Sequence, residues 1–413
     1  MRGRWPYALI AATCLLPRAV VLLHERGAIL ASSVEKSDIL ARVFVQSGTF
    51  GYVPGIPSAS TQPVYGWFLI VVYWIAGRHW WSLGTAQIAV AIGTALLVYE
   101  IGRRYISARA GLVAALIATL QPYLIWHDLH VNREILDQPL GAAMFLLAML
   151  AGSRPSLRLA SVLGVVSGVA ILANARLVLL PLAFAAYLLW RQAGWVVATL
   201  VPALAAVALA PWIVRNKVEV GCFAITTDAR ALWKANNPNT YALLAKGIWI
   251  DAVPELPGNP LTPTQARDIY TSSGRKVNVH ECAQQAHYSH LVFQFWEHHP
   301  GAKVKLMAQA TRLLWSPSVT ADADGSPSGG VLHSLRHFAE PAYMIPLYLL
   351  GLVGLFVVST PFRVLALTFL GYETLAAWVF AGTTRYRVPW DFVLALLAAA
   401  ALEKLPLRRS ASQ

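Results

Sequence analysis

The chain has 413 residues, of which 57% are hydrophobic and only 13% charged, and its formal net charge at pH 7 is +13. Apolar runs of about 20 residues recur along it, and an apolar helix of about that length spans the hydrocarbon core of a bilayer. These values exclude a set of soluble domains and favour an all-α polytopic membrane protein. Because the basic residues are scattered between apolar segments, the positive charge favours contact with anionic membrane lipids and not with nucleic acid.

The N-terminal segment starts with Arg2 and Arg4 and continues as an apolar run at 5–23. A secretory signal peptide shares this pattern, but Arg18 interrupts the run and many apolar segments follow it, so we expect a retained first spanning helix. An arginine inside a span is costly, and Arg18 is expected to face a polar cavity or the interface. Because basic residues concentrate in cytoplasmic loops, the N-terminus is predicted to lie inside.

The first outer loop, at about 24–81, contains an aromatic stretch at 63–77 whose placement decides the topology. If this stretch spanned the membrane, Arg103, Arg104 and Arg109 would lie outside and the charge pattern of every later loop would be reversed. We therefore expect amphipathic, interfacial helices in this loop. About ten spans then follow, with both termini in the cytoplasm, at 5–23, 82–102, 110–126, 135–151, 157–173, 176–190, 195–214, 341–358, 361–380 and 387–402.

This topology divides the chain into three parts: a transmembrane core with the first two outer loops at 1–214, a mixed outer-face segment at 215–340, and C-terminal transmembrane helices with a cytoplasmic tail at 341–413. The outer segment has turn-rich pieces too irregular to lie in lipid. Its stretch "GAKVKLMAQATRLLWSP" predicts a helix lying on the membrane, with Val304 and Leu314 on its apolar face. Cys222 and Cys282 both belong to this segment and are candidates for a disulfide, whereas the cysteine spacing indicates no metal site.

The stretch "HDLHVNREILDQPL" at 127–140 gathers six ionisable side chains between two long apolar runs. One interpretation is a solvated turn, and the other is a reaction centre at the membrane surface. A buried carboxylate can act as a general base, and an arginine fork suits a phosphate. His127 and His130, with Asp128 or Glu134, are also candidate ligands of a divalent metal, or else interfacial histidines bonded to water or headgroups.

Seven distinctive motifs follow one another along the chain: "EKSDILARVF", "STQPVYGWFL", "EIGRRYISARAG", "QPYLIWHDLHVNREIL", "NARLVLLPL", "PWIVRN" to "ANNPNT", and "TTRYRVPWDFVLALLAA". In this order the chain resembles, along nearly its whole length, the GT-C membrane glycosyltransferases, which include the dolichyl-phosphate-mannose-protein mannosyltransferases and the aminoarabinose transferases. The resemblance implies a polyprenyl-phosphate-linked sugar donor and inverting transfer to a hydroxyl of a glycan, lipid or protein acceptor. The sequence departs from the family pattern at Asp38, which is a single acidic residue where many relatives have an acidic pair.

The resemblance implies that Asp38 is the catalytic base and that Glu134 or Asp128 is a second acid. Their structural alternatives are a helix N-terminal acid for Asp38 and a pair with Arg133 for Glu134. The outer-face cations are candidate ligands of the donor phosphate or, alternatively, interfacial anchors; they are Arg385, Arg387, Arg176, Lys234 and Arg215. The candidates for substrate contact are Tyr52, Asn236 and Asn237, for which an aromatic belt and a turn are the alternatives.

The sequence therefore predicts a polyprenyl-phosphate-sugar-dependent glycosyltransferase of the bacterial inner membrane, with its site on the outer face and a divalent metal as an option. The rival class is a multi-span lipid or solute transporter or flippase, in which the same charges line a pathway. A non-catalytic subunit on the same scaffold is a third interpretation. No inverted repeat of broken helices is found in the sequence, and the ionisable groups gather at one face, which favours the enzyme.

Overall fold

The computed structural model describes residues 4–31, 36–255, 260–320 and 331–404. Within these ranges the fold is helical, and the β-structure consists of an isolated bridge between Val53 and Ile56. The predicted all-α fold class is confirmed.

The N-terminal half forms the first part of the helical bundle, and α2 and α3 fall within the predicted first outer loop at about 24–81. The helices are α1 (Trp5–His24), α2 (Lys36–Ser47), α3 (Pro63–Ala76), α4 (Trp80–Tyr105), α5 (Ala108–Thr119), α6 (Pro122–His127), α7 (Glu134–Ser153), α8 (Leu157–Ala173), η1 (Ala175–Leu177), α9 (Leu180–Trp190) and α10 (Trp195–Glu219).

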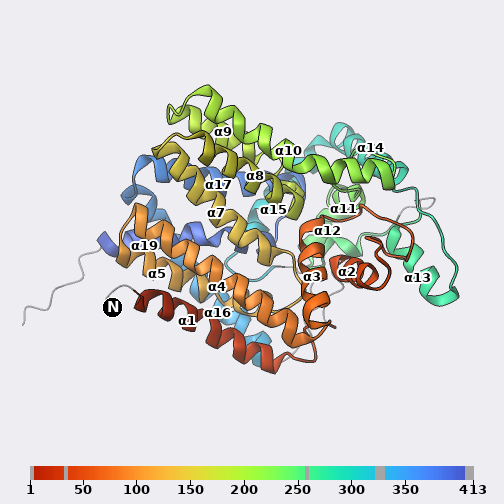
Figure 1. The fold of residues 1–413 in the computed structure, drawn as a ribbon, viewed down its shortest axis with the longest axis horizontal. Helices are drawn as coiled ribbons and strands as arrows, with labels where there is room; N and C mark the ends of the chain where they lie inside the picture. Colours follow the sequence, from red (N-terminus) through yellow and green to blue (C-terminus); the bar gives the residue numbers. More distant parts are fainter. Residues whose placement is uncertain (1–3, 32–35, 256–259, 321–330, 405–413) are drawn as a thin grey trace, which may run out of the picture.

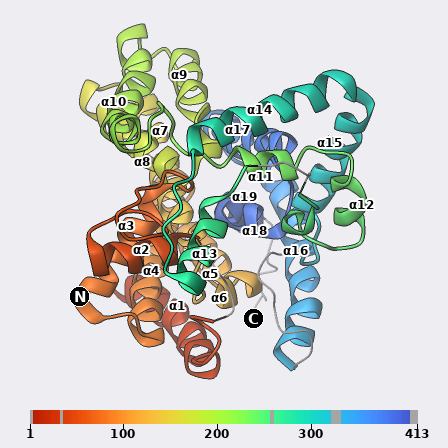
Figure 2. The ribbon, with the colours of Figure 1, turned by 90° about the vertical axis from the view of Figure 1, so that its right-hand side faces the viewer.

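The rest of the chain contains shorter helices followed by the C-terminal helices of the bundle. These are α11 (Ala229–Lys234), α12 (Thr240–Ala245), η2 (Ile250–Ala252), α13 (Pro263–Ser273), α14 (Glu281–His298), α15 (Pro300–Leu314), α16 (Val331–Val357), α17 (Thr360–Val379), α18 (Thr384–Arg387), η3 (Val388–Trp390) and α19 (Asp391–Lys404). Figure 1 shows α2 and α3 at the same end of the molecule as α11, α12 and α13, and Figure 2 shows α8 and α10 side by side.

Among the described residues, six helices are long and apolar enough to cross a bilayer: α1, α4, α7, α10, the Phe338–Val357 part of α16, and α17. Each corresponds to one of the ten predicted spans, and the count of ten stays a prediction. The helix α3 has 14 residues, which gives about 21 Å of helix, shorter than the hydrocarbon core. The helices α5 and α9, which overlap the predicted spans 110–126 and 176–190, are also this short, so the interfacial placement of α3 rests on the charge pattern and stays a prediction.

Small residues allow the bundle helices to approach closely. A Cβ on Gly164 of α8 would lie 2.7 Å from the carbonyl oxygen of Val201 on α10, and a Cβ on Gly102 of α4 would lie 2.5 Å from the Cα of Gly111 on α5. Helices in lipid associate through such van der Waals contacts, because lipid tails are as apolar as the helix surfaces. These glycines therefore allow α4 to pack closely on α5 and α8 to pack closely on α10.

A disulfide joins Cys222, three residues after the end of α10, to Cys282 in the first turn of α14, the pairing that the sequence left open. Glu281 is the first residue of α14. Its carboxylate accepts hydrogen bonds from the backbone N–H of Ala59 at 2.9 Å and from Thr227 Oγ1 at 2.6 Å. The first outer loop, the exit of α10 and the start of α14 therefore meet at one point.

The predicted apolar face of α15 is partly wrong. Leu306, Ala310 and Leu314 are the buried apolar side chains, whereas Val304 is exposed. The reason is long-range packing, because α15 lies against α17 and α14, and the two neighbours select a stripe that the isolated helix does not define.

Candidate active site

The 127–140 stretch is buried where α6 ends and α7 begins, so its interpretation as a solvated turn is wrong. Glu134, the first residue of α7, is 0% exposed. Its carboxylate lies 2.9 Å from Arg385 Nε, 3.5 Å from Arg133 Nε and 3.7 Å from His127 Nε2. The carboxylate thus joins the start of α7 to α18. Buried charges of this kind require such partners.

Among the predicted phosphate ligands, Arg176 lines a cavity and has a buried nitrogen available to a ligand. It belongs to η1, is 7% exposed, and its Nη1 lies 3.4 Å from Glu373 Oε1. Its guanidinium carbon lies 3.8 Å from the centre of the Tyr386 ring, a cation–π contact. Its Nη2 is buried without a hydrogen-bond partner among the residues that the structure describes. An arginine held in place on one side can donate to an anion on the other.

A cavity of about 90 Å³ lies beside Arg176. Arg133, Gln62, Thr226 and Asp228 also line it. Thr226 Oγ1, like Arg176 Nη2, is buried and has no partner in the described part of the chain. A cavity of this size holds a few water molecules or a polar group of similar size, such as a phosphate.

Asp38 lies in the first turn of α2 and is held by a neighbouring cluster. Its carboxylate accepts hydrogen bonds from Arg78 at 2.9 and 3.0 Å and from the Tyr73 hydroxyl at 2.6 Å. Arg42 Nε lies 3.2 Å away, and the hydrogen bond from Arg78 to Asp38 raises the pKa of that guanidinium. Asp38 does not line the Arg176 cavity, but Lys36 two residues earlier pairs with the cavity residue Asp228 at 2.7 Å.

Asp128 and Arg387 are bound in buried ion pairs away from the cavity. Asp128 Oδ2 accepts hydrogen bonds from Arg18 at 2.7 and 3.0 Å, and its Oδ1 accepts one from Gln138 at 2.8 Å. Arg18 therefore meets a polar partner inside the bundle, as its place within a span requires. Arg387 lies 3.2 Å from both Glu340 and Asp391. Neither residue has the geometry expected for contact with a substrate at the Arg176 cavity.

The other predicted cations also lie outside the cavity. Lys234 Nζ donates to the Asp251 carbonyl at 2.7 Å and lies 3.3 Å from Glu255, and burial lowers the pKa of this lysine. Arg215 pairs with Glu219 at 2.6 Å on the last turns of α10, beyond the predicted end of that span. Both cations have carboxylate partners within the chain.

The predicted substrate contacts are engaged in local structure. Asn236 Oδ1 accepts hydrogen bonds from Trp296 Nε1 at 2.9 Å and from Lys303 Nζ at 2.6 Å. Asn237 Oδ1 accepts from the N–H of Asn239 at 2.9 Å, which is the turn interpretation. Tyr52 is buried and accepts a hydrogen bond from Ser60 at 3.1 Å. Their predicted role in binding substrate is not tested by these contacts.

The residues do not fit the optional divalent metal. Across the described ranges, no three side chains of His, Cys, Asp or Glu gather as a metal site would require. His130 Nδ1 lies 2.9 Å from the Trp126 carbonyl, and Glu134 is surrounded by arginines. No step below is routed through a metal.

Sequence reasoning missed several residues that the structure brings to the site. Arg133 was seen only as a partner of Glu134, and Gln62, Thr226, Asp228 and Tyr386 carried no signal of their own. The proline after Gln62 and the polar run "ITTD" marked both segments as non-helical, but not as neighbours. Only the three-dimensional fold identifies the cavity that these residues share.

The fold and the site define an all-helical polytopic membrane protein with a buried, arginine-lined cavity where the loops at one end of the bundle meet. Residues 58–215, which run from the first outer loop through most of α10, match the family model of the dolichyl-phosphate-mannose-protein mannosyltransferases. They include Arg133, Glu134 and Arg176. A comparison with curated protein sequences gives no match.

Among solved structures, the chain is similar to the oligosaccharyltransferase AglB of Archaeoglobus fulgidus, with a TM-score of 0.52 and 13% identity over 97% of this chain and 50% of AglB. The same values hold for AglB in complex with an inhibitory peptide and a dolichol-phosphate. ArnT of Cupriavidus metallidurans, bound to undecaprenyl phosphate, gives a TM-score of 0.43 and 14% identity over 97% of this chain and 78% of ArnT. The chain spans about half the length of AglB. The resemblance to GT-C membrane glycosyltransferases is confirmed in fold and, over residues 58–215, in sequence.

Proposed function

We propose that the chain is a glycosyltransferase that moves a sugar from a polyprenyl-phosphate-linked donor to an acceptor hydroxyl at the outer face of the membrane. The family match over 58–215 and the GT-C fold support the reaction class. The dolichol-phosphate in the AglB complex supports a polyprenyl phosphate as the leaving group.

The observation that carries the proposal is the unpaired Nη2 of buried Arg176, in a cavity of phosphate size that Arg133 also lines. In glycosyl transfer from a lipid phosphate, negative charge builds on the phosphate oxygen as its bond to the sugar breaks. Donors that are already fixed in place stabilise such charge without reorganisation. Glu373 and Tyr386 fix Arg176, and Glu134 fixes Arg133 and Arg385.

The reaction forms one bond and breaks one. The acceptor oxygen attacks the anomeric carbon of the sugar while the bond from that carbon to the phosphate oxygen breaks. The bonding electrons leave with the polyprenyl phosphate, and the hydroxyl proton passes to a carboxylate, for which Asp38 is our candidate. Attack from the side opposite the phosphate inverts the anomeric centre. Glu134 acts as a positioning residue, since three basic side chains surround it.

The outer-face location is supported by the Cys222–Cys282 disulfide, because structural disulfides persist in oxidising compartments and are rare in the cytosol. The disulfide lies in the 215–340 segment, on the side of the bundle where Arg133 and Arg176 lie at the outer ends of α7 and α8 in the predicted topology. Both termini then lie in the cytoplasm.

The test supplies the protein in nanodiscs with a panel of polyprenyl-phosphate sugars and a membrane extract as the acceptor source, and it measures release of free polyprenyl phosphate. We compare the wild type with Arg176→Gln, Asp38→Asn and the control Arg191→Gln. Arg191 follows the other end of α9 and contacts the Trp190 ring, so the control removes an equivalent cation–π arginine away from the cavity.

The proposal predicts release by the wild type and by Arg191→Gln, and loss of release in Arg176→Gln and Asp38→Asn. Absence of release from every donor, with folded protein and a competent extract, would overturn the proposal and favour the transporter class. Equal release by Arg176→Gln would keep the reaction but remove the cavity from it.

A further inference from the structure

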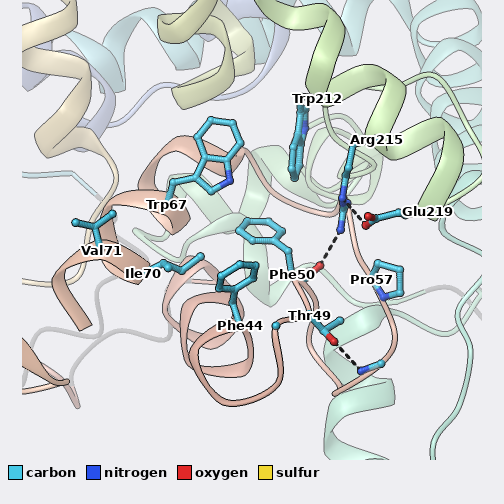
Figure 3. Close-up of a pocket in the computed structure, with 12 residues that line it drawn as sticks. Phe44, Thr49, Phe50, Pro57, Trp67, Ile70, Val71, Trp212, Arg215 and Glu219 are labelled. Carbon is cyan, nitrogen blue, oxygen red and sulfur yellow. Dashed lines mark hydrogen bonds and ion pairs between the residues drawn. The ribbon is translucent and has the colours of Figure 1, made fainter. Parts of the chain in front are cut away.

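An apolar groove of about 510 Å³ lies between α2, α3 and α10. Figure 3 shows the rings of Phe44, Phe50, Trp67 and Trp212 around it, with Arg215 and Pro57 on the side of Glu219. Trp212 contacts Phe50 and Trp67 edge-to-face, with ring centres 5.4 and 5.6 Å apart. The walls of the groove are therefore fixed by aromatic packing, and its open space suits an aliphatic chain.

The groove opens beside a strongly apolar surface of α3. Val71 lines the groove and is 53% exposed, and the neighbouring Trp74 and Ile75 are 81% and 74% exposed. Such a contiguous exposed apolar face is unusual next to water and is expected to meet lipid. A lipid chain can therefore reach the groove directly from the membrane.

A polar groove of about 600 Å³ adjoins the apolar groove. The two grooves share Gly55, Pro57 and Glu219 as walls. The far walls of the polar groove come from Lys276, Asn278 and His280, in the segment that leads to α14. The surface thus changes from apolar to polar across the turn at 55–57, which is the pattern that an amphiphile requires.

A lysine ammonium marks the boundary between the grooves. A Cβ on Gly55 would lie 3.4 Å from Lys276 Nζ, so the ammonium stands over the turn that both grooves share. Lys276 forms no ion pair with any residue that the structure describes. The one acidic wall, Glu219, is paired with Arg215 at 2.6 Å. The boundary therefore carries uncompensated positive charge, which is complementary to an anionic headgroup.

The grooves lie close to the Arg176 cavity. Pro57 lines both grooves and Gln62 lines the cavity, and five residues of extended chain span at most about 18 Å. The intervening Ala59 is fixed, since its N–H donates to Glu281 and its carbonyl accepts from the N–H of Thr227. A molecule in the grooves is thus held at a fixed short distance from the cavity.

We propose that the two grooves bind the acceptor, and that the acceptor is an amphiphilic lipid with an anionic headgroup. Its aliphatic chain lies in the apolar groove, its anionic group meets Lys276, and its remaining polar part extends through the polar groove. The role as acceptor rests on the proposed glycosyl transfer, whereas the binding of the lipid does not. The prenyl chain of the donor and a peptide are the competing occupants.

The first test maps lipid binding without any donor. Wild-type protein in phosphatidylcholine nanodiscs receives a trace of photoreactive phosphatidylglycerol, photoreactive phosphatidylcholine or photoreactive polyprenyl phosphate, and cross-linked peptides are identified by mass spectrometry. Val71→Trp fills the apolar groove from its open side. Leu182→Trp is the matched control, because Leu182 is a similarly exposed apolar residue on α9.

We expect phosphatidylglycerol to label the groove peptides above phosphatidylcholine, Val71→Trp to remove this labelling, and Leu182→Trp to leave it unchanged. Lys276→Glu should lower the headgroup preference about fivefold or more, since one basic residue near an anionic lipid contributes about that factor. Preferential labelling by polyprenyl phosphate would assign the groove to the donor and overturn the proposal. Equal labelling of the groove and of the α9 surface by all probes would also overturn it.

The second test separates the acceptor role from the proposed function. With a radiolabelled sugar donor, transfer should place the label in lipid-extractable product. Val71→Trp should lower this product without lowering donor hydrolysis, in which the sugar passes to water and polyprenyl phosphate is released. Label in protein, or equal lipid product from Val71→Trp, would overturn the inference while leaving the transferase intact. Groove labelling without turnover of any donor would overturn the proposed function and leave only lipid binding.

Discussion

The buried ion pair between Arg18 and Asp128 gives a sharp prediction, because the same carboxylate was a candidate catalytic acid. Both side chains are at most 1% exposed, and Arg18 donates to Asp128 Oδ2 twice, at 2.7 and 3.0 Å. Its third nitrogen donates to the carbonyl oxygen of Thr119 at 3.0 Å. We expect Arg18→Met to destabilise the protein strongly, because it leaves Asp128 with Gln138 as its side-chain donor.

The magnitude follows from the burial of both side chains of the pair. Removing one partner of a buried ion pair costs about 3–5 kcal/mol, since an uncompensated charge remains in a medium of low dielectric constant. Replacing both partners removes that charge, so Arg18→Met with Asp128→Leu should recover at least about 2 kcal/mol relative to the sum of the single losses. We therefore expect a large coupling energy between the Arg18 and Asp128 substitutions, whereas substitutions at distant sites are nearly additive.

The assay is a double-variant cycle on the free energy of unfolding in mixed micelles, combined with the donor-release assay. We expect the double variant to keep a measurable rate of release, because Asp128 joins α1 to α6 and α7 and does not line the Arg176 cavity. Additive stability losses would refute the ion-pair account. Full stability of the double variant with complete loss of release would return Asp128 to the catalytic site.

Three further predictions concern stability. Cys222→Ser should destabilise the outer segment by about 4 kcal/mol on the chain-entropy estimate for a 60-residue loop, and reductant should mimic the substitution; unchanged unfolding in reductant would contradict the disulfide's role. Burial lowers the pKa of Lys303 to about 8. The folded state therefore binds fewer protons than the unfolded state from about pH 8 to 10, and the free energy of unfolding should rise with pH in this range in the wild type but not in Lys303→Met. Parallel pH profiles of the unfolding free energy in the two proteins would contradict this prediction. Gly164→Leu should disrupt the packing of α8 on α10, because a Cβ there already approaches the Val201 carbonyl to 2.7 Å; thermal unfolding checks this, and an unchanged midpoint would show that the helices separate freely.

The long helices could be predicted because the requirement for a span is local. A run of about 20 apolar residues satisfies its backbone internally and meets lipid wherever it occurs, and six of the predicted spans have this length. The polarity around Arg18 was predictable for the same reason. Its partner was not, since Asp128 lies 110 residues away and nothing local distinguishes a carboxylate that pairs from one that reacts.

The site was predictable only as a set of polar segments at one face. The 127–140 stretch and Arg176 stand out in the sequence, because charges next to spans need partners or a function. Gln62 and Thr226 were not, since their importance depends on a cavity shared by segments more than 160 residues apart. Asn236 depends on long-range contacts in the same way: its side-chain oxygen accepts hydrogen bonds from Trp296 and Lys303, which no local pattern connects to it.

The most direct test of the account is the position of the phosphate in an electron cryo-microscopy structure of the protein in nanodiscs with polyprenyl phosphate. The account predicts the phosphate in the Arg176 cavity, within hydrogen-bond distance of Arg176 Nη2 and Thr226 Oγ1, and loss of that density in Arg176→Gln. A phosphate bound at Lys276 on the boundary of the two grooves, with the Arg176 cavity filled by water alone, would contradict it.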